Sequence, residues 1–242
     1  MGQTPQEPNI LRPVPSDPPG GGPELPDELA RLPHGRHGLP SDFVERNQRQ
    51  RLLVSLVAIV AESGYNAATI TGVAEGAGVT TRAFYKYFDT VEACYLTAFE
   101  AGSELLGERL AEAWTDGGDW PARVRAALAA GLDFFAGAPE LASVLLTEPF
   151  VAGPEVAARY RAELGRLVPY LREGRELSGE GASFPDTTER GLIGSVASRI
   201  GRTVGAGDAD ALGEMLPDLT QFVLTPYLGA TAARKVARAK RT

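Results

Sequence analysis

The chain has 242 residues, a net charge of −7 and an apolar content that is ordinary for a globular protein. No apolar run is long enough to span a membrane, and the first residues lack the basic start and apolar core of a signal peptide, so we expect a cytoplasmic protein without a membrane partner. The single cysteine, Cys94, excludes an intrachain disulfide, and its apolar neighbours predict a buried thiol rather than a redox sensor.

Residues 1–40 contain more than half of the 18 prolines and a run of three glycines at 20–22. This composition favours a disordered N-terminal tail, because such a segment buries too little apolar surface to offset the entropy of folding. The tail ends with Arg36 between His34 and His37. Two interpretations stay open for Arg36, namely an arm that reaches a DNA groove and an ordinary solvated linker.

Apolar residues at helical spacing between Leu52 and Val60 predict a first helix that begins near Ser41 or Asp42 and is closed by Gly64. Two shorter helices are expected after it. We predict that Thr69 opens the second helix, which Gly76 and Gly78 end, and that Thr80 caps the third.

The third predicted helix, 80–87, has two different faces. Phe84 and Phe88 share one face and can pack on Val73, Ala74 and Val79 of the preceding segment. The opposite face is polar. Short helices joined by a glycine-marked turn, the second with a polar face, form the layout of a helix-turn-helix, which predicts DNA binding. The candidate contacts are Thr69, Thr80, Thr81, Arg82, Tyr85, Lys86 and Tyr87.

The residue types on this polar face suit two kinds of contact. Arg82 can donate two hydrogen bonds to a guanine in the major groove. Thr80, Thr81, Tyr85 and Lys86 suit phosphate oxygens, which set the register of a protein on DNA without reading its sequence, and Thr69 can contact a flanking phosphate. One such residue alone would be an ordinary surface side chain or helix cap, whereas the set on one helix favours DNA contact.

The rest of the chain shows helical patterns and no convincing β alternation. Breaks at 116–119, 136–139, 151–154, 177–185 and 205–208 divide it into about six further helices, so the sequence predicts an all-α fold. We expect four parts: the tail 1–40, a DNA-binding domain 41–95 with its motif at 69–88, a helical regulatory and dimerisation domain 96–232, and a basic C-terminal tail 233–242.

The segments 59–65, 69–79 and 80–88 together resemble the DNA-binding domain of TetR-family regulators, above all in Ala77-Gly-Val-Thr80 and Phe84-Tyr-Lys-Tyr-Phe88. The resemblance implies a homodimer, a palindromic operator, and a C-terminal helical domain whose small-molecule effector releases DNA, with repression as the default. Two positions depart from the pattern. Val91 stands where the family often has a phosphate-binding lysine, and Arg82 stands where it often has glycine, which makes Arg82 the candidate for operator discrimination.

Two further sets of residues are candidates within residues 96–232. Aromatic side chains of the middle helices could surround an apolar effector, although plain core packing is the commoner role of each. These are Trp114, Trp120, Phe134, Phe135, Phe150, Tyr160 and Tyr170. Apolar positions of the last two helices could form a four-helix dimer interface, and periodicity alone does not separate this from packing within one chain. These are Leu192, Val196, Ile200, Leu219, Phe222 and Val223.

An enzyme is the first rival class. The only histidines, His34 and His37, lie in the N-terminal tail, and the chain has no phosphate-binding loop, nucleophile elbow or metal-ligand cluster. We therefore expect no catalytic residue, metal or cofactor. The second rival is a TetR-like ligand-binding or interaction protein with weak or lost operator binding, which Val91 and the nearly neutral charge of residues 41–95 would favour.

Overall fold

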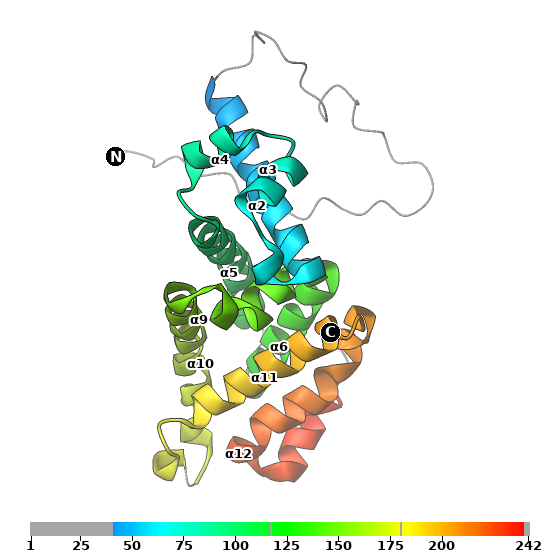
Figure 1. Ribbon diagram of the computed structural model, residues 1–242. Coiled ribbons are helices and arrows are strands. Elements are labelled where there is room, and N and C mark those ends of the chain that lie inside the picture. Colours follow the sequence, from blue (N-terminus) through cyan, green and yellow to red (C-terminus); the bar gives the residue numbers. More distant parts are fainter. Residues whose placement is uncertain (1–40, 117, 180, 240–242) are drawn as a thin grey trace, which may run out of the picture.

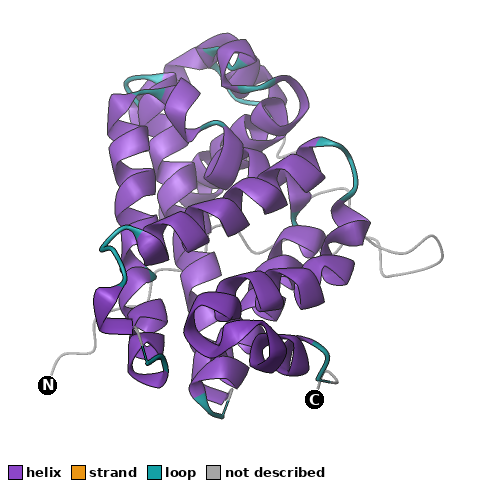
Figure 2. Cartoon of the chain, turned by 90° about the horizontal axis from the view of Figure 1, so that it is seen from below, coloured by secondary structure: helices purple, strands orange, loops and turns teal. Residues whose placement is uncertain are grey.

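The computed structural model describes residues 41–116, 118–179 and 181–239, and these form helices joined by short loops, without a strand in those ranges (Figures 1 and 2). The all-α fold expected from the sequence is confirmed. The tail 1–40, including Arg36, lies outside the described residues. Within them, no single helix is long and apolar enough to cross a membrane, and only the pair Trp120–Gly137 and Pro139–Thr147, bent by 110°, passes that test jointly.

The first three α-helices and a short 3₁₀ turn form the helix-turn-helix end of the molecule (Figure 1). Both predicted threonine caps are present: Oγ1 of Thr69 accepts from the N–H of Gly72 at 3.0 Å, and Oγ1 of Thr80 accepts from the N–H of Ala83 at 3.1 Å. Gly78, in the turn, has φ +62°, a left-handed conformation that favours glycine. The elements are α2 (Ser41–Ser63), η1 (Tyr65–Ala67), α3 (Ile70–Gly76) and α4 (Thr81–Tyr87).

Two long helices, α5 (Val91–Asp116) and α6 (Trp120–Gly137), pack against each other and support the rest of the chain. The predicted division at 95–96 falls inside α5, so the chain has no break in secondary structure there. After α6 come three short elements: the first lies against α2, the second against α2 and α5, and the third against η1 and the helix that follows it. They are α7 (Pro139–Ala142), the π-helix η2 (Ser143–Thr147) and α8 (Pro149–Ala152).

The C-terminal part differs from the expected pattern at two places. Residues 209–215, which follow the expected break at 205–208, form a separate 3₁₀ helix, and the last helix begins at Leu216 with Pro217 in its first turn. That helix also kinks at Gly229, whose φ is +75°. The elements are α9 (Pro154–Arg166), α10 (Val168–Arg172), η3 (Glu173–Leu177), η4 (Gly181–Ser183), α11 (Thr188–Gly205), η5 (Ala209–Met215) and α12 (Leu216–Ala237).

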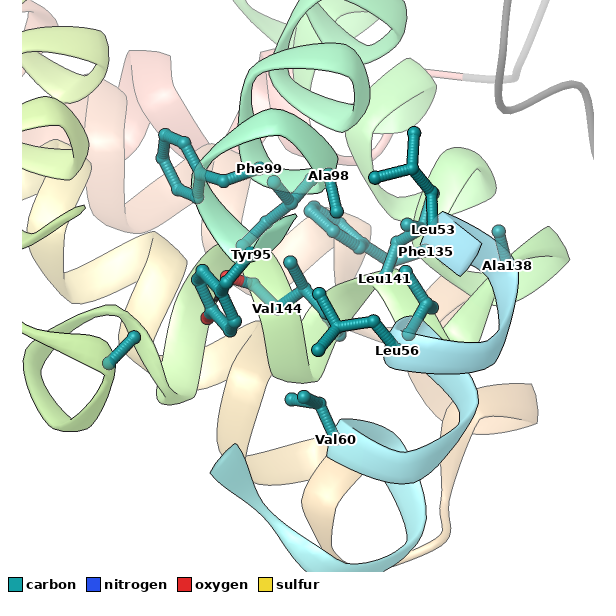
Figure 3. Packing of buried hydrophobic residues seen from close by; sticks show 14 of the residues in the cluster. Leu53, Leu56, Val60, Tyr95, Ala98, Phe99, Phe135, Ala138, Leu141 and Val144 are labelled. Carbon is teal, nitrogen blue, oxygen red and sulfur yellow. Dashed lines mark hydrogen bonds between the residues drawn. The ribbon is translucent and has the colours of Figure 1, made fainter. Parts of the chain in front are cut away.

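One apolar core joins the helix-turn-helix to the helices that follow it. Leu53, Leu56 and Val60 of α2 point toward residues of α5, α6, α7 and η2, including Tyr95 and Val144 (Figure 3). The Tyr95 hydroxyl donates to the carbonyl of Val144 at 2.6 Å inside this core. Cys94, in the same core, is fully buried, and burial raises the pKa of its thiol to about 12. The predicted burial of Cys94 is therefore confirmed.

A second, smaller core lies between α6, α11 and α12, and beside it lies an ion pair whose carboxylate is buried. Nε and Nη2 of Arg175 donate to the two carboxylate oxygens of Glu189 at 2.7 and 2.8 Å, and the Glu189 side chain has no exposed surface. The Tyr227 hydroxyl lies 3.4 Å from the same carboxylate. The hydrogen bonds from Arg175 hold the pKa of Glu189 below its ordinary value, and the pair fixes η3 to α11.

Candidate DNA interface

Helix α4 is held in place by its apolar face. Phe84 is fully buried and Phe88 nearly so, with their ring centroids 5.7 Å apart, and both belong to the main core together with Val73 and Ala74 of α3. The predicted packing of this face is therefore present. A helix as short as α4 is only marginally stable by itself, so these contacts both stabilise it and set its orientation.

The opposite face of α4 is open to solvent and carries the predicted side chains. Thr81, Arg82, Tyr85 and Lys86 are all exposed, and the Tyr85 side chain retains 57% of its accessible surface. A hollow of about 560 Å³ lies on this face and is lined by Thr80, Arg82, Ala83, Tyr85 and Lys86. The structure therefore brings the base-reading and phosphate-binding candidates together on one accessible surface of the molecule.

Thr69 and Thr80 combine a capping role with exposure. Each Oγ1 accepts a backbone hydrogen bond at the start of its helix, and both residues are exposed. Accepting that bond leaves the hydroxyl proton free to be donated. Each threonine can therefore cap its helix and donate to a phosphate oxygen at the same time, close to free N–H groups of the helix terminus.

Tyr87 lies differently from the other candidates. It is half-buried, its hydroxyl donates to Oε1 of Gln48 in α2 at 3.0 Å, and Nζ of Lys86 lies 5.5 Å from the centre of its ring. The structure thus gives Tyr87 a partner within the protein, which links the end of α4 to α2. The sequence patterns did not identify Gln48 as a partner of Tyr87. Gln48 precedes the apolar run of α2 and belongs to no motif, so no pattern could have found this contact.

Val91 begins α5 beside the recognition helix. Oγ1 of Thr90 caps this helix by accepting from the N–H of Ala93 at 3.0 Å, and Val91 is half-buried against the main core. The side chain of Val91 therefore contributes to packing and has no group that binds phosphate. At this helix terminus the backbone and Thr90 can supply donors to an anion.

The aromatic residues predicted to surround an effector do not gather around one cavity. They form separate edge-to-face contacts, namely Trp114 with Tyr170, Trp120 with Tyr227, Phe134 with Phe135, and Phe150 with Tyr160. Phe150 and Tyr170 are exposed, with 60% and 43% of their surface accessible. Two hollows, of about 470 and 560 Å³, lie on the helix-turn-helix. The structure thus shows these aromatic residues in separate packing contacts, and their role toward an effector stays a prediction.

Most residues predicted for the dimer interface pack within the chain. Leu192, Ile200, Leu219 and Val223 are buried, which corrects their assignment to the partner-facing surface. On α11 and α12 these buried residues alternate with exposed ones. The apolar pattern therefore identified the face of each helix that packs inside the chain, not the face open to a partner. Val196 is half-buried, and only Phe222 among the six is exposed, with 45% of its surface accessible.

Residues 52–98 match the model for bacterial regulatory proteins of the tetR family. Among solved structures, the fatty acid degradation regulator FadR of Bacillus halodurans is 18% identical with a TM-score of 0.64, over 73% of this chain and 94% of that one. A TetR-like transcriptional regulator from Rhodococcus is 19% identical with a TM-score of 0.62, over 79% of this chain and 99% of that one.

The FadR regulator of Bacillus subtilis, solved in complex with stearoyl-CoA, is also similar, with 20% identity and a TM-score of 0.54 over 69% of this chain and 96% of that one. These structures share the all-α fold, and the sequence match falls on the helix-turn-helix. The resemblance drawn from the sequence is therefore confirmed for residues 52–98, which match the tetR family model, and the solved structures share the all-α fold of the chain.

Proposed function

We propose that the protein is a homodimeric regulator that binds a palindromic operator through α4 and represses transcription until a small apolar effector releases it. The observation that carries the proposal is the exposed face of α4, where Arg82 lies among side chains suited to phosphate while Phe84 and Phe88 fix the helix from behind. Arg82 then reads a base and Lys86 with Tyr85 sets the register on the backbone. Residues 41–95 act as the DNA-binding domain and 96–232 as the regulatory and dimerisation domain.

The proposed dimer forms through the outward faces of α11 and α12. On α11 this face includes exposed small residues, Gly191, Ser195 and Ser198, and a Cβ added at Gly191 would meet open space. On α12 it carries Phe222. Small residues let two helices approach closely, and a large exposed apolar side chain is stabilised when a partner covers it. Both observations support a dimer contact on this outward face, and not at the buried residues first predicted for it.

The proposed effector is small and apolar, and an acyl chain is the class to test first. Support comes from the similar FadR structure of Bacillus subtilis, which was solved in complex with stearoyl-CoA. In the described residues the aromatic side chains fill the regulatory part; the Trp120 ring, for example, lies so close to Gly174 that a Cβ there would overlap it. An effector that enters beside Trp120 must therefore displace side chains of the smaller core.

The test of the proposal is selection of bound duplexes from a random DNA pool by the purified protein at physiological salt. We expect a palindromic consensus whose affinity falls as salt rises yet stays well above that for random DNA. No enrichment by a folded, dimeric protein would favour the ligand-binding or interaction alternative instead. With the consensus as probe, saturated acyl-CoA thioesters of increasing chain length can then be scored for release of DNA, with free CoA as the control.

A further inference from the structure

One hydrogen bond connects the regulatory part of the chain to the turn in front of the helix-turn-helix. Oε2 of Glu148 accepts from the backbone N–H of Tyr65 at 2.9 Å, across 83 positions in the sequence. The same carboxylate lies against Gly64, where an added Cβ would be 3.5 Å from Oε2. Gly64 has φ +77°, and this backbone conformation turns the chain out of α2 and presents the Tyr65 N–H to the carboxylate.

On the DNA side, this bond holds the segment that begins α3. Tyr65 is the first residue of η1, and η1 leads directly to the cap residue Thr69. Thr69 in turn starts the helix on which α4 packs. The position of the Tyr65 amide therefore helps to set where the N-terminus of α3 lies relative to the rest of the molecule.

On the regulatory side, Glu148 is the residue that ends the π-helix η2. Its own N–H donates to the carbonyl of Ser143 at 3.0 Å, the wider hydrogen bond of a π-helix, and single π-helical turns often occur at functional sites. A π-helical turn can convert to an α-helical one by shifting each bond by one residue. Such a shift would rotate Glu148 and move its carboxylate away from the Tyr65 amide.

The π-helix is also in close contact with the helix of the proposed dimer face. At Gly201 of α11 an added Cβ would come within 2.9 Å of Cγ2 of Thr147 and 3.4 Å of Cβ of Leu146. On its other side Leu145 packs on Gly102 of α5, at 3.2 Å from an added Cβ. A displacement of α11 or α5 would therefore push directly on the turn that carries Glu148.

We propose that Glu148 is a positioning residue for DNA binding, which holds the helix-turn-helix in its operator-binding orientation from the regulatory part of the chain. Its carboxylate, fixed by η2, sets the Tyr65 amide and with it the start of α3. A movement of α5 or α11 reaches α4 through this bond. The inference rests on the proposed operator binding and adds to it the residue through which the regulatory helices act on the DNA-binding surface.

The experiment compares Glu148→Ala and Glu148→Gln with wild type, and Glu140→Ala is the matched control because Glu140 is an exposed glutamate in the neighbouring α7. The readouts are affinity for the selected operator, affinity for random duplex, the thermal midpoint, and amide hydrogen exchange at Tyr65. The glutamine carbonyl can still accept the bond from the Tyr65 N–H, whereas alanine cannot.

We expect Glu148→Ala to lose about tenfold in operator affinity, the size of one charge-assisted hydrogen bond, while affinity for random DNA stays unchanged. Its Tyr65 amide should exchange faster, and Glu148→Gln and Glu140→Ala should stay near wild type in both measurements. A folded Glu148→Ala protein with wild-type operator affinity would overturn the inference, because a contact needed only for stability changes the thermal midpoint alone.

Failure of the proposed function gives a different result. In that case wild type itself shows no preference for any duplex, and hydrogen exchange still decides on Glu148. Faster exchange confined to Gly64–Gly76 in Glu148→Ala would keep Glu148 as the residue that orients this segment. If Glu148→Ala exchanged at the wild-type rate throughout that segment, the role of Glu148 in orienting it would be refuted.

Discussion

The hydroxyl of Tyr87, at the end of the recognition helix, donates to Oε1 of Gln48 in α2 at 3.0 Å. This bond connects α4 to a helix whose apolar face reaches into the main core, and it supplements the apolar contacts of Phe84 and Phe88. The orientation of α4 therefore depends on a polar contact as well as on core packing.

Tyr87→Phe removes that bond while keeping the ring. We expect a loss of about 0.5–1.5 kcal/mol in the free energy of unfolding, measured by urea denaturation, because one partly buried hydrogen bond is lost. Tyr85→Phe is the matched control, since the Tyr85 ring is exposed and its stability should stay near wild type. Equal stability of both variants would show that the Gln48 contact contributes nothing.

Arg82→Ala should reduce affinity for the selected operator by about 1–3 kcal/mol and relax the preference at one base pair of each half-site. The physical reason is the loss of a bidentate contact to a base, which random DNA does not offer in a fixed position. A repeat of the duplex selection with the variant measures both effects. Unchanged affinity and unchanged base preference would rule out a reading role for Arg82.

Lys86→Ala should weaken binding to operator and to random duplex alike and should lower the slope of log affinity against log salt by about one. Lys86 is exposed beside Arg82, and it can contribute a point charge to a phosphate. The measurement is a salt series on both kinds of duplex. A loss restricted to the operator would contradict the phosphate role and would give Lys86 a share in base reading.

Glu189→Gln should lower the thermal midpoint at neutral pH, and the difference from wild type should shrink as the solution becomes acidic. Arg175 lowers the pKa of Glu189 in the folded chain, so its stabilisation is present above the ordinary glutamate pKa and is lost as pH falls through the lowered value. Glu112→Gln is the control, because the Arg109–Glu112 pair at 3.8 Å is exposed and contributes little. A pH-independent difference would contradict the ionised pair.

Phe222→Glu should convert the dimer to a monomer in sedimentation, because a charge would then lie in the proposed apolar contact between the α12 helices. Phe150→Glu provides the matched control, since Phe150 is also exposed but lies in α8. Dimers of unchanged stability in Phe222→Glu would place the interface on another face, and monomers in both variants would indicate a general effect of the added charge.

The sequence predicted the helix-turn-helix closely because its determinants are local. Thr69 and Thr80 cap helices within a few residues of themselves, and Phe84 with Phe88 marks the inner face of α4 by spacing alone. The tail 1–40 and the assignment of Arg36 lie outside the described residues.

Contacts between distant segments could not be predicted in the same way. Periodicity identified the apolar side of α11 and α12, yet it did not show that Leu192 and Val223 meet residues of their own chain. The aromatic residues were grouped by type, whereas their positions depend on how the helices cross. Nothing in the local sequence predicts the hydrogen bond between Glu148 and Tyr65, because no sequence pattern identifies a π-helix or shows which backbone amide its last carboxylate will meet.

The apolar core in Figure 3 has a consequence for how the chain unfolds. Leu53, Leu56 and Val60 bury their side chains against Leu141 and Val144, so a fragment cut after α4 would expose this strip of α2 to water. We expect such a fragment to aggregate or stay unfolded, and the helix-turn-helix to melt together with α5, α6 and η2 in one cooperative transition. On this expectation the helix-turn-helix is stable only together with the helices that cover α2.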